Sequence, residues 1–250
     1  MPGLQGTVSR WPSNTMNTES TYRYAIYYMP ALHTEWWTAG CHWLGRCAAT
    51  GRTLPQLSIP GISSAQFQQL TQEPRRYGWH ATLKAPFQLD RGHGLQNLRT
   101  ALLNLANELP AFEMPALQAS TEGGFLALRP VHRDPCLHAV ADACVTRLHH
   151  LVKPLGPDEL TRRRQAQLSP TQDRLLMQWA YPWVLEEFKF HLSLTGPIHA
   201  LAAAEREALM QAAQTHFEAL PPTRFEHLAL FAEPHKGAEF QWVESVEMRG

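Results

Sequence analysis

The alternation of apolar and polar positions divides the chain into strands and helices that follow one another in a similar order twice. Short runs rich in β-branched and aromatic residues, bounded by prolines or turn residues, predict strands at residues 23–29, 124–129, 227–232 and 239–243. Longer stretches with apolar residues three or four positions apart predict helices at residues 32–44, 65–72, 95–109, 135–152, 157–179 (interrupted at Pro170) and 200–217.

Two further predicted strands have nearly the same sequence. Residues 77–87 read YGWHATLKAPF and residues 188–198 read FKFHLSLTGPI, so that His80 aligns with His191 and Thr82 with Ser193. Side chains two residues apart on a strand point to the same face, so each histidine is expected to share a face with its hydroxyl. Two such strands can present two imidazoles and two hydroxyls to one cleft.

The repeated order of elements predicts an α+β fold with an internal duplication. We expect two antiparallel sheet-and-helix lobes around a central cleft, formed as one bilobal domain by residues 21–250. A chain of 250 residues can bury a core of that size. We expect residues 1–20 to be a disordered leader.

Composition narrows the classes of partner. Lys plus Arg equals Asp plus Glu, at 22 each, so no basic surface for long nucleic acids is expected, although a small anionic substrate needs only a local positive patch. The sequence lacks an apolar run long enough to cross a membrane, and its first 20 residues lack the apolar core of a signal peptide. The four cysteines form no C-x-x-C pair, so we expect a cytoplasmic protein with free thiols and leave its oligomeric state open.

The two H-x-[ST] motifs gain specificity from their surroundings. Alone the pattern is weak, and two buried strands with core histidines are the simpler interpretation. In both copies, however, an aromatic residue precedes the histidine, a leucine follows the hydroxyl, and a proline comes three positions after that leucine.

The paired motifs His80-Ala81-Thr82 and His191-Leu192-Ser193 resemble the signature of the two-histidine phosphoesterase superfamily. The segments RYAIYYMP, ELTRRRQ and WAYPWV are similar to a branch of uncharacterised proteins often encoded beside phosphonate-breakdown genes. The resemblance covers about residues 22–242. It implies a duplicated bilobal fold and phosphoester chemistry that needs neither a metal nor another cofactor.

Histidine suits such chemistry because both of its protonation states are accessible near neutral pH. Of His80 and His191, one would activate the attacking oxygen and the other, initially protonated, would protonate the leaving oxygen; the sequence does not assign the two roles. Thr82 and Ser193 would donate hydrogen bonds to phosphoryl oxygens. No cluster of carboxylates accompanies these strands, so no metal site is expected.

Strand alternation extends the expected cleft to further side chains. Lys84 is placed on the face of His80, and one residue of the run Arg162–Arg164 could also reach the site, because successive helical residues point about 100° apart. The predicted substrate-binding residues are Lys84, Tyr27, Arg23, Phe125, Arg129, Thr195 and Tyr181.

These residues together favour a metal-independent phosphodiesterase that hydrolyses a small, cyclic phosphodiester. A ribose cyclic phosphate or a nucleoside 2′,3′-cyclic phosphate would fit, and the resemblance suggests phosphonate metabolism. A non-catalytic phosphate-binding accessory protein is one alternative, and an RNA-end phosphodiesterase or 2′–5′ ligase is another. No G-x-x-x-x-G-K-[ST] phosphate loop is present.

Overall fold

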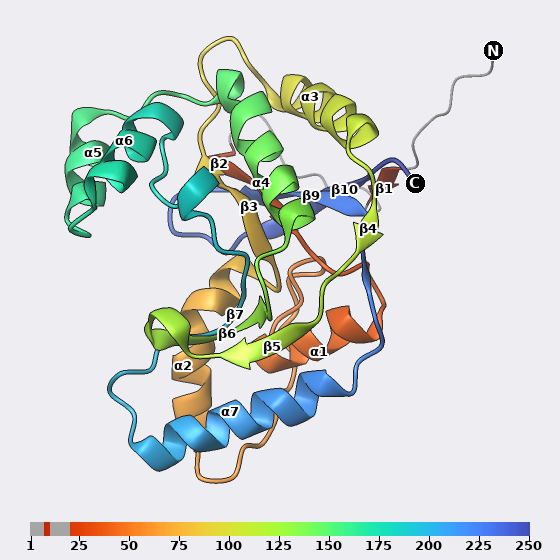
Figure 1. The fold of residues 1–250 in the computed structure, drawn as a ribbon, viewed down its shortest axis with the longest axis vertical. Helices are drawn as coiled ribbons and strands as arrows, with labels where there is room; N and C mark the ends of the chain where they lie inside the picture. Colours follow the sequence, from red (N-terminus) through yellow and green to blue (C-terminus); the bar gives the residue numbers. More distant parts are fainter. Residues whose placement is uncertain (1–7, 11–20) are drawn as a thin grey trace.

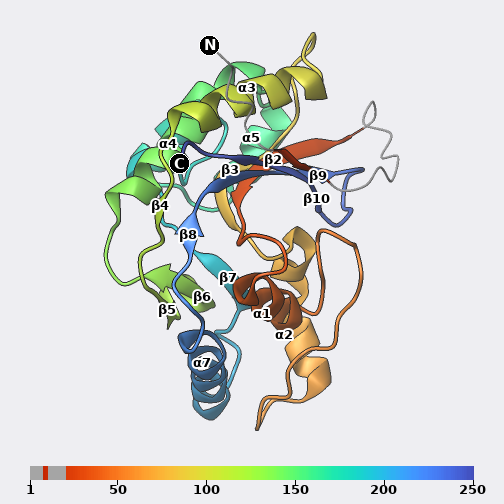
Figure 2. The same ribbon diagram turned by 90° about the vertical axis from the view of Figure 1, so that its right-hand side faces the viewer.

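The computed structural model describes residues 8–10 and 21–250, and in them two β-sheets face each other with helices on their outer sides (Figure 2). The larger sheet has the strand order β1-β10-β9-β2-β3 and the smaller sheet has the order β5-β6-β7. Neighbouring strands are antiparallel throughout both sheets. The strands are β1 (Val8–Arg10), β2 (Arg23–Tyr28), β3 (Ala81–Phe87), β5 (Leu117–Ser120), β6 (Phe125–Pro130), β7 (Leu192–Pro197), β9 (His227–Glu233) and β10 (Gln241–Glu247).

The helices are exchanged between the two sheets. Helices α1 (Glu35–Leu44) and α2 (Ser64–Tyr77) connect β2 to β3, yet α2 packs against β7 of the smaller sheet, beside α7 (Ala203–Glu218) (Figure 1). Conversely, α4 (Pro135–Arg147) connects β6 to β7 but packs against β3, and α3 (Leu95–Glu108) covers β9 and β10.

Shorter elements complete the fold. The ribbon of β4 (Phe112–Glu113) and β8 (Arg224–Phe225) lies between the two sheets (Figure 2). Helices α5 (Pro157–Arg164) and α6 (Pro170–Trp179) lie to one side of the molecule (Figure 1). Single-turn 3₁₀ helices occupy Glu122–Gly124, His149–Leu151 and Leu185–Glu187.

Local sequence fixes where α1 begins and ends. The Thr34 hydroxyl accepts a hydrogen bond from the Trp37 N–H group and so caps the first turn. Gly45 ends the helix with a φ of 73°, a left-handed conformation that glycine adopts without a steric penalty. Between these caps the helix buries Trp36, Trp37 and Trp43, which explains why its apolar face lies against the core.

The first histidine segment is anchored to the helices of the smaller sheet. Trp79, the residue before His80, is fully buried and stacks on Phe217 of α7 with ring centroids 5.4 Å apart. In α1, Trp43 donates from Nε1 to the Leu194 carbonyl of β7 at 2.9 Å. Aromatic residues of both halves of the sequence therefore share one core.

The α+β class is confirmed, and most predicted elements lie within a few residues of the observed ones. The largest difference is at residues 73–80, where α2 continues to Tyr77, with Pro74 inside it, and β3 begins only at Ala81. The strands β4, β5 and β8 were not predicted. The larger sheet has five strands and the smaller three, so the internal duplication remains a prediction.

Of the predicted leader at residues 1–20, Val8–Arg10 form β1 and pair with β10; the other positions lie outside the described residues. Among the helices that the structure describes, none combines the length and the apolar character needed to cross a bilayer.

Candidate functional site

His80 and His191 occupy equivalent positions, each immediately before a strand of one of the two facing sheets. His80 Nδ1 lies 2.9 Å from the Gly78 carbonyl oxygen, and His191 Nδ1 lies 2.7 Å from the Lys189 carbonyl oxygen. A carbonyl oxygen can only accept, so Nδ1 carries the hydrogen in both rings. Each Nε2 is therefore left with a lone pair when the ring is neutral.

The His80 ring lies against Tyr27 of β2, with centroids 3.8 Å apart and planes 31° from parallel. Its Nε2 accepts a hydrogen bond from the Thr82 hydroxyl at 3.2 Å, so the predicted common face of this pair is confirmed. Burial lowers the pKa of His80 to about 4; the Gly78 carbonyl opposes this shift, and the charge of His191 adds to it. His80 is thus neutral at pH 7.

His191 meets the edge of Phe125, with centroids 5.4 Å apart. Burial also lowers its pKa, the Lys189 carbonyl opposes this, and the Arg129 charge adds to it. Without a ligand, burial and neighbouring positive charge favour the neutral form of both histidines, and the expectation that one of them starts the reaction protonated stays a prediction for the substrate-bound state.

In the smaller sheet, Ser193, Phe125 and Arg129 lie on one face. Ser193 pairs with Ala127 across β6 and β7, so Phe125 and Arg129 share the face of that pair. The Arg129 guanidinium lies 4.8 Å from the centre of the Phe125 ring and donates to the carbonyls of Ser120 and Glu122. This face of the smaller sheet combines a hydroxyl, an aromatic ring and a fixed positive charge.

Lys84 does not share the face of His80 and Thr82, and that prediction is corrected. Thr82 pairs with Tyr27, whereas Lys84 pairs with Ile26, the residue adjacent to Tyr27 on β2. Two residues of β3 are thus advanced for one of β2, and β3 contains a β-bulge between Thr82 and Lys84. Because Ile26 and Tyr27 point to opposite faces, Lys84 points away from Thr82. Its ammonium is buried and donates to the Val145 carbonyl of α4 at 3.0 Å.

Thr195 is also placed differently from the expectation. Its side chain is buried, accepts a hydrogen bond from the Leu126 N–H group at 3.0 Å and donates to the Gly196 carbonyl at 2.8 Å. The register of β6 and β7 shifts at this point, and the hydroxyl takes the place of a ladder partner for Leu126. Both of its hydrogen bonds are used within the fold.

Arg23 and Tyr181 line a cavity of about 260 Å³ beside β3, together with Lys84. Neither His80 nor His191 is among the described residues that line this cavity. The predicted binding residues therefore separate into two places: Tyr27, Phe125 and Arg129 surround the histidines, whereas Lys84, Arg23 and Tyr181 surround the cavity.

A buried carboxylate near Arg23 was missed by sequence reasoning. Glu233, at the end of β9, accepts hydrogen bonds from Arg23 Nε at 2.5 Å, from Arg76 Nη2 at 2.5 Å and from the Gly237 N–H group at 2.8 Å. Burial acts to raise the pKa of Glu233, but the Arg23 and Gly237 hydrogen bonds outweigh it and the pKa is lowered. Nothing in the local sequence connects Glu233 with Arg23, because they are far apart in the chain.

Among the residues that the structure describes, no group of three or more His, Cys, Asp or Glu side chains is placed to hold a metal ion.

Comparison with known proteins gives a family and two relatives. The model of a family described as "protein of unknown function (DUF1045)" matches residues 82–241. A protein named "Ribose 1,5-bisphosphate phosphokinase PhnN" from Janthinobacterium sp. (strain Marseille) is 34% identical over 235 residues, which cover 92% of this chain and 52% of that protein. A protein of the same name from Laribacter hongkongensis (strain HLHK9) is 32% identical over 219 residues, covering 88% of this chain and 50% of that protein. The chain thus spans about half the length of these relatives.

These names contradict the expected activity. A phosphokinase transfers a phosphoryl group to an acceptor, whereas the sequence had suggested a hydrolase that cleaves a phosphodiester with water. The prediction of a cyclic phosphodiesterase is therefore corrected. Neither name supports an RNA-end phosphodiesterase, a ligase or an accessory protein, and membership of the two-histidine phosphoesterase superfamily is not shown by these matches.

Proposed function

The chain belongs to the family described as "protein of unknown function (DUF1045)", and from that premise we propose that its two-histidine cleft binds a phosphorylated ribose during phosphoryl transfer. The substrate class follows the printed name of the two relatives. That name also agrees with the resemblance to proteins encoded beside phosphonate-breakdown genes. Because the chain spans about half of each relative, the proposal concerns only the sugar-phosphate site.

The observation that carries the proposal is the matched anchoring of His80 and His191. A backbone carbonyl two residues earlier holds each Nδ1–H group, and each Nε2 is thereby fixed as the atom that exchanges a proton. A histidine that only packs in a core needs one hydrogen-bond partner. It does not need a second histidine, anchored in the same way, on the facing sheet.

The surrounding side chains suit a phosphate on a sugar. The Thr82 hydroxyl already points to His80 Nε2 and could turn to a phosphoryl oxygen, and Ser193 is its counterpart on β7. The Arg129 guanidinium supplies positive charge beside His191. Phe125, which is partly exposed beside His191, offers its ring for the apolar side of a ribose.

Proton transfer in this cleft requires a bound anion. Both imidazoles are neutral without ligand because burial lowers their pKa values. A bound phosphate would raise both pKa values, since an opposite charge nearby favours the protonated ring. In a transfer from a nucleoside triphosphate, one neutral imidazole would take the proton of the attacking phosphate oxygen as that oxygen bonds to the terminal phosphorus and the bond to the leaving nucleoside diphosphate breaks, while the other, protonated imidazole would donate to the bound phosphate. The nucleotide-binding loop common in kinases is absent from this sequence, so a phosphoryl donor has no assigned site.

Calorimetric titration with ribose 1,5-bisphosphate tests the binding part of the proposal. The wild-type chain should bind it, and His80→Asn and His191→Asn should each weaken binding by about tenfold or more, the cost of one lost charge-assisted hydrogen bond. His235→Asn is the matched control, because His235 is exposed on the turn between β9 and β10. Unphosphorylated ribose should not bind measurably to the wild type or to any of the three variants. Equal affinities for the wild type and both site variants would reject the proposal.

Phosphorus NMR tests the proton-transfer part. With ribose 1,5-bisphosphate and ATP, phosphoryl transfer should fall by roughly 10²–10⁴-fold in either histidine variant and stay unchanged in His235→Asn. Turnover that persists in both variants would remove the histidines from the reaction even if they still bind the sugar.

A further inference from the structure

The cavity beside β3 is lined by more positive than negative side chains. Among the described residues, its cations are Arg23, Lys84, Lys153, Arg162 and Arg163, and its single acidic residue is Glu159. Glu233 does not line the cavity but pairs with Arg23; with Glu233 counted as well, there are still two carboxylates against five cations. The excess is local, because the chain as a whole has as many acidic as basic residues.

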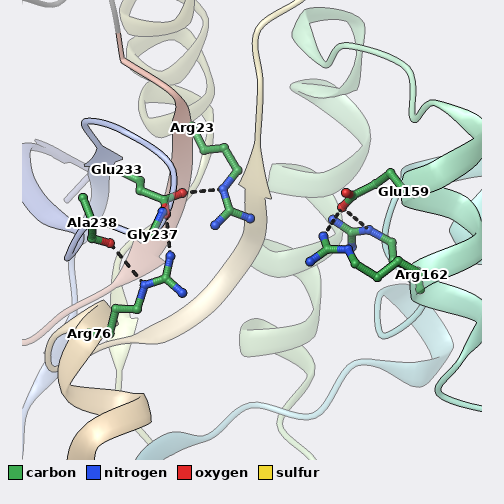
Figure 3. Close-up of polar contacts among 8 residues, drawn as sticks. Arg23, Arg76, Glu159, Arg162, Glu233, Gly237 and Ala238 are labelled. Atoms are coloured by element: carbon green, nitrogen blue, oxygen red, sulfur yellow. Dashed lines mark hydrogen bonds and ion pairs between the residues drawn. The ribbon is translucent and has the colours of Figure 1, made fainter.

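Carboxylates hold the arginines of this cavity from two sides. On the sheet side, Arg23 is tied by Nε to Glu233 at 2.5 Å. On the helix side, Glu159 accepts from Arg162 Nη2 at 2.6 Å and from Arg163 Nε at 3.0 Å. The guanidinium groups of Arg23 and Arg162 point toward each other across the space between β3 and α5 (Figure 3). Guanidiniums oriented in this way keep further N–H groups for a ligand.

Buried groups complete the lining. The buried Lys84 ammonium donates one hydrogen bond to the Val145 carbonyl of α4. An ammonium has three N–H groups, so it can donate further hydrogen bonds to a ligand. Arg163 lies 5.8 Å from the centre of the Tyr181 ring. Within the described part of the chain, the buried Trp179 Nε1–H group has no hydrogen-bond partner. A donor of this kind is costly to bury unless a ligand or water satisfies it.

From this geometry we propose that the cavity is a second binding site, separate from the two-histidine cleft, for the phosphate group of a small phosphomonoester. Phosphate matches the site because planar guanidiniums bind its oxygens in pairs and a buried ammonium adds charge. The aromatic side chains of Tyr181 and Trp179 would contact the remainder of the molecule. A sugar phosphate and a nucleoside monophosphate share this chemistry. The site goes beyond the proposed function, which concerns only the cleft between the sheets.

Calorimetric titration of the full chain with inorganic phosphate, ribose 5-phosphate and AMP tests the site. The wild type should bind at least one ester, and the double variant Arg162→Gln/Arg163→Gln should weaken that binding by about tenfold or more. Arg164→Gln is the matched control: it lies on the same helix, pairs with Asp173 instead of Glu159 and does not line the cavity. It should bind as the wild type does.

The outcomes separate this site from the cleft. Tighter binding of ribose 5-phosphate than of AMP assigns the site to sugar phosphates, and the reverse assigns it to nucleotides. Binding that survives in His191→Asn but falls in the double arginine variant supports a second site. Binding lost in His191→Asn and retained in the double variant would overturn it while leaving the proposed function intact. Failure of all three probes to bind the wild type would also overturn it, and melting curves check that both arginine variants fold.

Discussion

The ionisation of His80 is set by burial, with the charge of His191 adding to it. Its ring lies between Tyr27 and the Gly78 carbonyl, and removal from water disfavours the protonated form more than that carbonyl favours it. A neutral imidazole at rest is useful at a phosphate site, because its Nε2 can accept a proton and then hold it against the anion.

Stability should therefore depend on pH through His80. Its pKa in the folded chain is about 4, below the usual value of 6.5, so between these values the unfolded chain binds a proton that the folded chain does not. Stability is full above pH 6.5 and falls as the pH drops toward 4, by up to about 3 kcal/mol. Urea unfolding of the wild type and of His80→Phe at several pH values measures this. The variant should lose much of the decline, and an unchanged decline would contradict the assignment.

Lys84 gives ligand binding in the cavity a pH dependence in the opposite direction, since binding should weaken as the pH rises. Burial lowers the pKa of Lys84 to about 8, and the nearby Cys144 thiol acts against that shift. A bound phosphate favours the charged ammonium, so phosphomonoester affinity should fall as the pH rises through about 8. Titrations between pH 7 and 9.5 measure the change. Lys84→Met should bind more weakly at pH 7 and lose the dependence; a variant with the wild-type profile would exclude Lys84 from the site.

At the scale of elements, irregular strand register decides which residues share a face with the two histidines. A bulge in β3 turns Lys84 away from Thr82. Where the register of β6 and β7 is irregular, the Leu126 N–H group donates to the Thr195 hydroxyl. Thr195→Val keeps the shape but removes the hydroxyl, leaving the Leu126 N–H group unpaired. We expect a loss of about 1–3 kcal/mol in the free energy of unfolding. Thr195→Ser, which keeps the hydroxyl, should lose clearly less, and equal losses would show that the methyl group matters instead.

The sequence predicts elements better than it predicts faces. Apolar spacing located α3, and residue composition located α7 and the strand β2, because these signals are local. The pairing of His80 with Thr82 followed from strand alternation and is observed. The same alternation misplaced Lys84, because a bulge depends on the partner strand and not on the strand's own residues. Glu233 and Arg23 meet only through the pairing of β2 with β9, which no local pattern reports.

At the scale of the whole molecule, the exchange of helices makes each half of the sequence depend on the other. Helix α2 packs on β7 and α4 packs on β3, so part of each sheet is covered by a helix that connects two strands of the other sheet. Trp79, the residue before His80, packs on Phe217 of α7. Trp43 of α1 donates a hydrogen bond to β7. The positions of His80 and His191 consequently depend on contacts between segments that are far apart in the chain.

Gly40 offers a test of that interdependence. Replacing glycine by alanine inside a helix ordinarily stabilises it by up to about 1 kcal/mol. In α1, however, a Cβ atom at position 40 would lie 2.1 Å from the Trp79 ring, which is fully buried and cannot move freely. Gly40→Ala should therefore destabilise the protein by about 1–3 kcal/mol. Gly156→Ala, where the added atom meets open space, should change stability by less than about 1 kcal/mol.

Because Trp79 lies in the core shared by both sheets, Gly40→Ala should shift the whole unfolding transition and not one part of it. Tryptophan fluorescence and far-ultraviolet circular dichroism should give the same lowered midpoint in urea, as expected for a cooperative two-state transition. Two separated transitions, with only one of them shifted, would mean that the sheets unfold independently. The exchanged helices would then be contacts between lobes that fold independently, and His80 and His191 could move apart without either sheet unfolding.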